Sequence, residues 1–144
     1  MPIITAADLG TNLYPEVITE ISRADNTITD AAINAAIQEA MMYLSRFDLV
    51  QLFGDATTAA TVTDEFLKSL VKDLACWHLV RLSSTGVDYE VFRTAYVDAV
   101  SVLNKIQEGK IQPSGWPYAD TTNLDTPPGD AINWHSNPKR HNHY

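Results

Sequence analysis

The feature that most constrains the fold is helical periodicity, which recurs over three stretches separated by polar breaks. Between Thr29 and Phe47, apolar side chains return at steps of three and four residues, as on one face of an α-helix. Thr29 or Asp30 can cap the first turn, and the apolar pattern stops at Gly54. The apolar face of this first predicted helix comprises Ile33, Ala36, Ile37, Ala40, Met41, Leu44 and Phe47.

The two later stretches have the same period. The second predicted helix starts near Thr63 or Asp64 and runs to about Leu82. The third runs from about Asp88 to Gly109, a residue type that commonly follows a helix end. Their predicted core residues are Leu67, Leu70, Val71, Leu74 and Trp77 in the second helix, and Phe92, Tyr96, Ala99, Leu103 and Ile106 in the third.

Shorter elements are expected before these helices. Thr5 and Asp8 have the spacing of a capping box, with Asp in place of Glu, which predicts a short helix. Pro15 suits the first turn of another helix over about residues 15–23. The segment 111–118 could add one short edge strand. We therefore expect an all-α fold, a bundle of three long helices with one or two short N-terminal helices, in a domain spanning residues 1–112.

The composition changes after residue 112. Residues 113–144 contain five of the seven prolines and have no helical period, so the segment cannot offset its ordering entropy alone. It nevertheless keeps large apolar side chains, and Lys139 and Arg140 could meet acidic groups of a neighbouring subunit. These features predict an extended C-terminal arm that orders against a partner through Trp116, Tyr118, Ile132, Trp134, Lys139, Arg140 and Tyr144.

Charge and composition exclude several classes of protein. The net charge of −8 disfavours general binding to nucleic acid, because an acidic surface repels phosphates. Cys76 is the single cysteine, so neither an intramolecular disulfide nor a cysteine-based zinc site is expected. No apolar stretch approaches the ~20 residues of a membrane span. The N-terminus does not resemble a signal peptide, which predicts a protein retained in the cytoplasm of the producing cell.

Candidate chemistry is sparse. His135, His141 and His143 form a weak metal-binding pattern, because no carboxylate or cysteine lies beside them. Cys76 and His78 are two residues apart on a predicted helix and do not face each other, so a buried cysteine and a half-buried histidine are expected. Residues 25–30 look faintly like a calcium loop, but a turn leading into a helix cap is favoured. With no glycine-rich phosphate loop or nucleophile elbow, we expect neither an enzyme nor a cofactor.

Each predicted long helix carries a short motif of characteristic residues. They are Asp30, Ala36, Ala40, Tyr43 and Leu44 in the first long helix, Leu70, Asp73, Ala75, His78 and Leu79 in the second, and Tyr96, Ala99, Leu103, Ile106, Gly109 and Lys110 in the third. In the order of its helices and in these motifs, the chain resembles the small helical head–tail connector proteins of tailed bacteriophages, in particular the Mu-like prophage connector family. The resemblance covers about residues 1–112.

The resemblance implies a structural virion protein, made in the host bacterial cytoplasm and placed at the head–tail interface. Copies of such an adaptor form a ring under the portal and carry the DNA channel toward the tail. The implied partners are the portal protein, identical subunits, and a tail or stopper protein, with DNA only as passing cargo and no membrane. The alternative is a small helical binding domain with a metal site in its histidine-containing tail.

Overall fold

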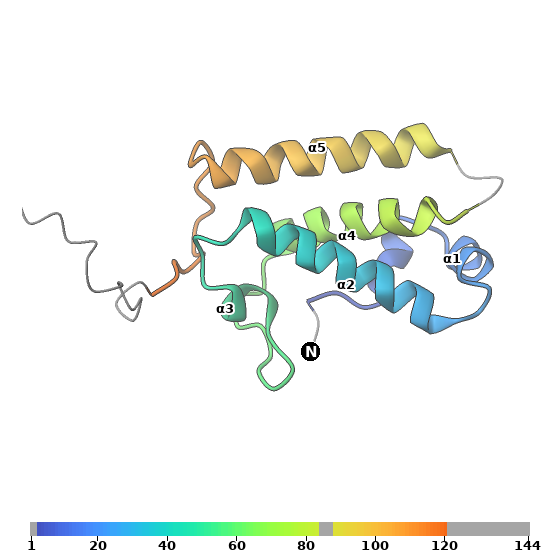
Figure 1. Ribbon diagram of the computed structural model, residues 1–144, viewed down its shortest axis with the longest axis horizontal. Coiled ribbons are helices and arrows are strands. Elements are labelled where there is room, and N and C mark those ends of the chain that lie inside the picture. The colour runs from blue at the N-terminus through green and yellow to red at the C-terminus, as the bar shows by residue number, and fades with distance from the viewer. Residues whose placement is uncertain (1–2, 84–87, 121–144) are drawn as a thin grey trace, which may run out of the picture.

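The computed structural model describes residues 3–83 and 88–120, and the all-α fold expected from the sequence is confirmed there (Figure 1). None of the helices in these two ranges is long and apolar enough to cross a membrane. Within them, β structure is limited to one isolated antiparallel bridge between Phe47 and Tyr118, so the edge strand considered for residues 111–118 does not form. The elements are the 3-10 helix η1 (Asp8–Thr11) and the α-helices α1 (Pro15–Ser22), α2 (Asn26–Tyr43), α3 (Leu49–Phe53), α4 (Glu65–Val80) and α5 (Tyr89–Gln107).

Helix α4 lies at the centre of the molecule. It packs against α2 and α5, and these two outer helices contact each other much less. Figure 1 shows α2 and α5 running in the same direction, with α4 antiparallel to both. η1 and α1 lie at the end where α2 begins and α4 ends, whereas α3 lies at the opposite end. The bundle therefore has two distinct ends.

The core follows the predicted helix faces, with small side chains at the centre of α2. Ala36 and Ala40 are fully buried, which permits close approach of α2 to α4. Met41, Trp77, Phe92 and Tyr96 were expected in the core but are only half-buried. Met41, Phe92 and Tyr96 pack against the edge of the core. The predicted core residues that are buried are Ile33, Ile37, Leu44, Leu67, Leu70, Val71, Leu74, Ala99, Leu103 and Ile106.

The predicted bounds of the first long helix are wrong at both ends. Its cap is Asp25, whose carboxylate accepts a hydrogen bond from the Thr27 amide at 2.9 Å, and Thr29 is buried inside the helix. Residues 25–30 were expected to form a turn leading into a helix cap, but Asp25 is itself the cap and the residues from Asn26 onward are already helical. At the other end α2 stops at Tyr43, so Phe47 belongs to the connection before a separate helix, α3. Apolar spacing alone did not reveal this break, because Leu44 and Phe47 are both buried, as they would be in one continuous helix.

The remaining terminal signals were predicted more closely. Asp64 and Asp88 cap α4 and α5 through their side chains, and Pro15 opens α1. Gly109 has φ +79°, the left-handed conformation that glycine adopts readily after a helix. Both the amide and the hydroxyl of Thr5 donate to the Asp8 carboxylate, at 2.7 and 2.8 Å, and the turn leads into η1 rather than an α-helix.

Candidate functional site

The C-terminal end of the described chain folds back onto the helical body. Trp116 is only 5% exposed, and its ring packs edge-to-face on Phe47 with centroids 5.4 Å apart. The indole N–H donates a hydrogen bond to Oδ2 of Asp64. The other oxygen of the same carboxylate accepts from the Phe66 amide at 2.8 Å and so caps α4. One aspartate thus fixes both the start of the central helix and the position of Trp116.

Tyr118 extends this attachment across the surface. Its ring stacks on Phe47 with centroids 5.1 Å apart and planes 19° apart, and the Arg46 guanidinium lies 5.6 Å from the Tyr118 centroid. The backbone adds two hydrogen bonds, from the Asp48 amide to the Pro117 carbonyl at 2.9 Å and from the Ala119 amide to the Arg46 carbonyl at 3.1 Å. We call Arg46, Phe47, Trp116 and Tyr118 the aromatic junction.

The aromatic junction changes the interpretation of the predicted arm. Trp116 was expected to be an anchor for a partner's pocket, but in this structure it fills a site in its own chain. Tyr118 remains 56% exposed and available to a partner. Residues 113–120, assigned to the arm by composition, are therefore packed on the helical domain.

The other predicted site residues lie outside the described residues. They are the arm residues Ile132, Trp134, Lys139, Arg140 and Tyr144, and the candidate metal ligands His135, His141 and His143. The histidine-tail metal site therefore stays a prediction. Within residues 3–83 and 88–120, no group of three histidine, cysteine or carboxylate side chains is placed to hold a metal ion.

A polar cluster that the sequence did not reveal joins the three longest helices. Glu39 on α2 contacts His78 on α4, with 2.7 Å between Oε2 and Nε2, and accepts a hydrogen bond from the Tyr96 hydroxyl on α5 at 2.7 Å. The side chains of Glu39 and His78 are 19% and 21% exposed, so the expected half-burial of His78 is confirmed. The hydrogen bond to Glu39, helped by burial and by the nearby negative charge, raises the pKa of Tyr96 to about 12. The cluster orients the helices at their partly solvated edge.

Cys76 is buried, as expected from its place on the second predicted helix. Burial, and secondarily the charge of Asp73, raises the pKa of its thiol to about 12. The thiolate is the nucleophilic form of cysteine, and it is therefore scarce here near neutral pH. Cys76 acts as a small apolar core residue.

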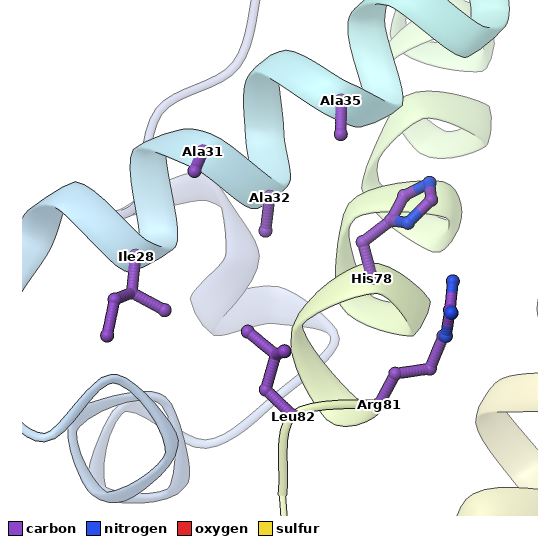
Figure 2. Close-up of a pocket in the computed structure, with 7 residues that line it drawn as sticks. All are labelled: Ile28, Ala31, Ala32, Ala35, His78, Arg81 and Leu82. Carbon is purple, nitrogen blue, oxygen red and sulfur yellow. The ribbon is translucent and has the colours of Figure 1, made fainter.

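A groove lies between the first half of α2 and the end of α4, and Figure 2 shows its lining. It has a volume of about 460 Å³. The α2 wall is formed by Ala31, Ala32 and Ala35, and the α4 wall by His78 and Arg81. Ile28 and Leu82 lie at one end, and Leu82 is 60% exposed. The groove has an apolar floor and a cationic rim at Arg81. These features suit a ligand that presents an apolar side chain next to a carboxylate.

The aromatic junction holds the start of the C-terminal segment at one end of the bundle, and the groove lies near the other end. Comparison of the chain with models of protein families, with curated proteins and with solved structures finds no match to any of them.

Proposed function

We propose that this protein is a structural subunit of a phage head–tail connector. Identical copies form a ring between the portal protein and a tail or stopper protein, and DNA passes through that ring. The protein is made in the cytoplasm of the host bacterium and incorporated into the virion. It acts by binding other proteins, and the proposal includes no catalytic step or cofactor.

The first support is the placement of the residues that carry the resemblance. Ala36 and Ala40 lie fully buried on α2, the helix that packs most closely on α4. Leu103 and Ile106 are fully buried on α5, and Gly109 turns the chain after that helix with a positive φ. The resemblance therefore rests on positions that determine how helices pack, which are informative about fold.

The observation that carries the proposal is the aromatic junction. It holds residues 113–120 on the body through a buried indole, an aromatic stack and two backbone hydrogen bonds. Residues 121–144 consequently begin at a fixed point on the domain. A segment with a fixed origin loses less freedom when its far end binds a partner, which favours its use as a docking arm.

The charge of the chain is compatible with a DNA channel. The net charge is −8, and an acidic wall repels phosphates rather than holding them. DNA would then slide past the subunits without adhering. DNA is cargo in this proposal, and no DNA-binding site is assigned.

The decisive experiment is binding to portal-bearing, tailless heads of the same phage. The full-length chain is compared with a chain truncated after Asp120, which retains Trp116 and Tyr118 and therefore keeps the aromatic junction intact. Truncation after Ile111 would also remove the buried Trp116. A loss of binding could then result from a loss of stability rather than from the absence of the arm.

We expect the full-length chain to bind in ring stoichiometry and the truncated chain to fold but bind weakly. Circular dichroism and the urea midpoint of the truncated chain provide the folding control. If both chains bind equally, the connector proposal stands, and the arm is expected to bind the next component of the assembly instead of the portal. If neither chain binds, the connector proposal is wrong.

A further inference from the structure

The groove between α2 and α4 has the features of a site for another chain. Leu82 is 60% exposed at its end, and the alanines of α2 leave open space above the helix backbone (Figure 2). Arg81 is exposed on the rim and forms no ion pair with any other residue of the described chain. An occupant that covers the groove should therefore present apolar side chains beside an acid.

The C-terminal segment of this chain has that chemistry. Its sequence from 130 to 134 reads DAINW. In an extended chain, alternate side chains face the same side, so Asp130, Ile132 and Trp134 would share one face. Ile132 and Trp134 match the apolar floor, and Asp130 matches Arg81 on the rim. This is the only part of residues 121–144 in which an acid alternates with two large apolar side chains.

The groove and Asp120 lie towards opposite ends of the bundle, so the arm of one copy can meet the groove of the next when copies line up end to end. The described chain ends beside the end of α2, whereas the groove lies along its first half (Figure 1, Figure 2). The 18-residue helix α2 is about 27 Å long. The groove residues from Ile28 to Ala35 lie about 12–22 Å back along α2 from its last residue, Tyr43. The ten residues from Asp120 to Asp130 are long enough to reach the groove of the same copy or of a neighbour, and the cross-linking experiment below separates these two cases.

An attachment point at one end and a receptor near the other end make a head-to-tail contact. Such a contact uses different surfaces on the two copies, and it closes into a ring when the rotation between copies permits. We propose that the groove of one subunit binds residues 130–134 of a second copy of this chain, with Ile132 and Trp134 over the alanines and Asp130 at Arg81. The contact would join neighbouring subunits of the proposed ring. The contact itself does not depend on the proposed connector function, but its closure into a ring does.

Cysteine cross-linking between full-length variants tests the contact. One protein carries Leu82→Cys in the groove and the other carries Ile132→Cys in the arm. The two are mixed, oxidised and separated on a denaturing gel. Native Cys76 is 1% exposed and stays out of the reaction. The control partner carries Gln38→Cys, which is exposed on the same helix α2 but does not line the groove.

We expect a disulfide-linked heterodimer from the groove and arm variants and only background from the Gln38→Cys control. Adding Ala35→Glu to the groove variant should lower the heterodimer yield roughly tenfold, because it places a charge against apolar side chains and near Asp130. Adding Gln38→Glu, which introduces the same charge outside the groove, should leave the yield unchanged.

Two results would overturn the proposal. One is a heterodimer yield no higher than that of the Gln38→Cys control. The other is a fast-migrating monomer from a chain carrying both cysteines, without heterodimer from the mixture, because the groove would then hold the arm of its own chain. Binding to phage heads is measured in a separate experiment. Cross-linking between copies can therefore be observed even if the chain does not bind heads, and head binding can be observed without cross-linking.

Discussion

The helical body and the segment 113–120 are both packed, but different interactions hold them. In the body, α4 buries apolar side chains against two neighbouring helices, and fully buried residues such as Leu67, Leu74 and Leu79 recur along it. The segment depends on Trp116, its hydrogen bond to Asp64, the Tyr118 stack and two backbone hydrogen bonds. Stability is therefore distributed in the body and concentrated at a few contacts in the segment.

That difference suggests that the segment can detach without unfolding the body. Regions with few buried contacts open at lower free energy than the core does. A domain built in this way can keep its fold while the start of its C-terminal arm is released or redirected. Substitutions in each region can test whether the two are separable.

The largest effect is expected in the body. Leu74 is fully buried at the centre of α4, so Leu74→Ala should lower the free energy of unfolding by about 2–5 kcal/mol through lost apolar burial and a residual cavity. Urea unfolding followed by circular dichroism measures this change. Val97→Ala is the matched control, since Val97 is 53% exposed and its truncation should cost less than about 0.5 kcal/mol. Equal losses of unfolding free energy in the two variants would contradict the placement of Leu74 in the core.

Trp116→Ala should cost about 2–3 kcal/mol, below the ~3–5 kcal/mol typical of a buried aromatic, because the segment can detach by itself. Trp116→Phe keeps a ring but loses the donor to Asp64, and should cost about 1 kcal/mol. Hydrogen exchange gives the sharper readout. The amides of Asp48 and Ala119 should exchange faster while those of α4 change little. Equal acceleration in α4 would show that the two regions are one cooperative unit.

Two glycines allow a matched comparison of the regions. Gly109 and Gly115 have φ +79° and +80°, so replacement of either by alanine should cost about 1 kcal/mol of conformational strain. A methyl group at Gly109 would lie 3.2 Å from Nη1 of Arg46, whereas one at Gly115 would have no neighbour within 4 Å. Gly109→Ala should therefore be the more destabilising in urea unfolding. The difference in stability between the two glycine variants should disappear when Arg46 is replaced by alanine. A difference that persists would exclude the contact with Arg46 as its cause.

The smallest effect should come from Tyr96→Phe, which removes the hydroxyl that donates to Glu39 and should cost about 1 kcal/mol at neutral pH. The folded-state pKa of Tyr96 is raised to about 12, above the ordinary value of about 10. Its stabilising contribution is thus complete below about pH 10 and is lost as the pH rises toward 12.

Urea midpoints across that range should fall less in Tyr96→Phe than in the unmodified chain. Tyr14→Phe provides the control, because Tyr14 is 77% exposed and its replacement should leave the pH dependence unchanged. The same fall in all three proteins would remove Tyr96 from the explanation.

Features that depend on neighbouring residues along one helix could be predicted from the sequence. The buried faces of α4 and α5, the caps Asp64 and Asp88, and the proline start of α1 could all be predicted, because apolar spacing and a side chain beside a free amide act locally. The start of α2 was misplaced because several residues near Asp25 can cap a helix, and packing selects among them.

Contacts between residues that are distant in the sequence depend on how the helices pack. Trp116 and Asp64 are 52 positions apart, and Tyr96 and Glu39 are 57 positions apart. No periodic signal connects such pairs. An isolated tryptophan in a proline-rich segment has the same sequence pattern whether its side chain packs into a site on its own chain or into a partner protein. The site that buries Trp116 forms only when Phe47, between α2 and α3, lies near Asp64 at the start of α4. In the same way, only the alignment of three helices turns Glu39 from a solvated carboxylate into the centre of a polar cluster.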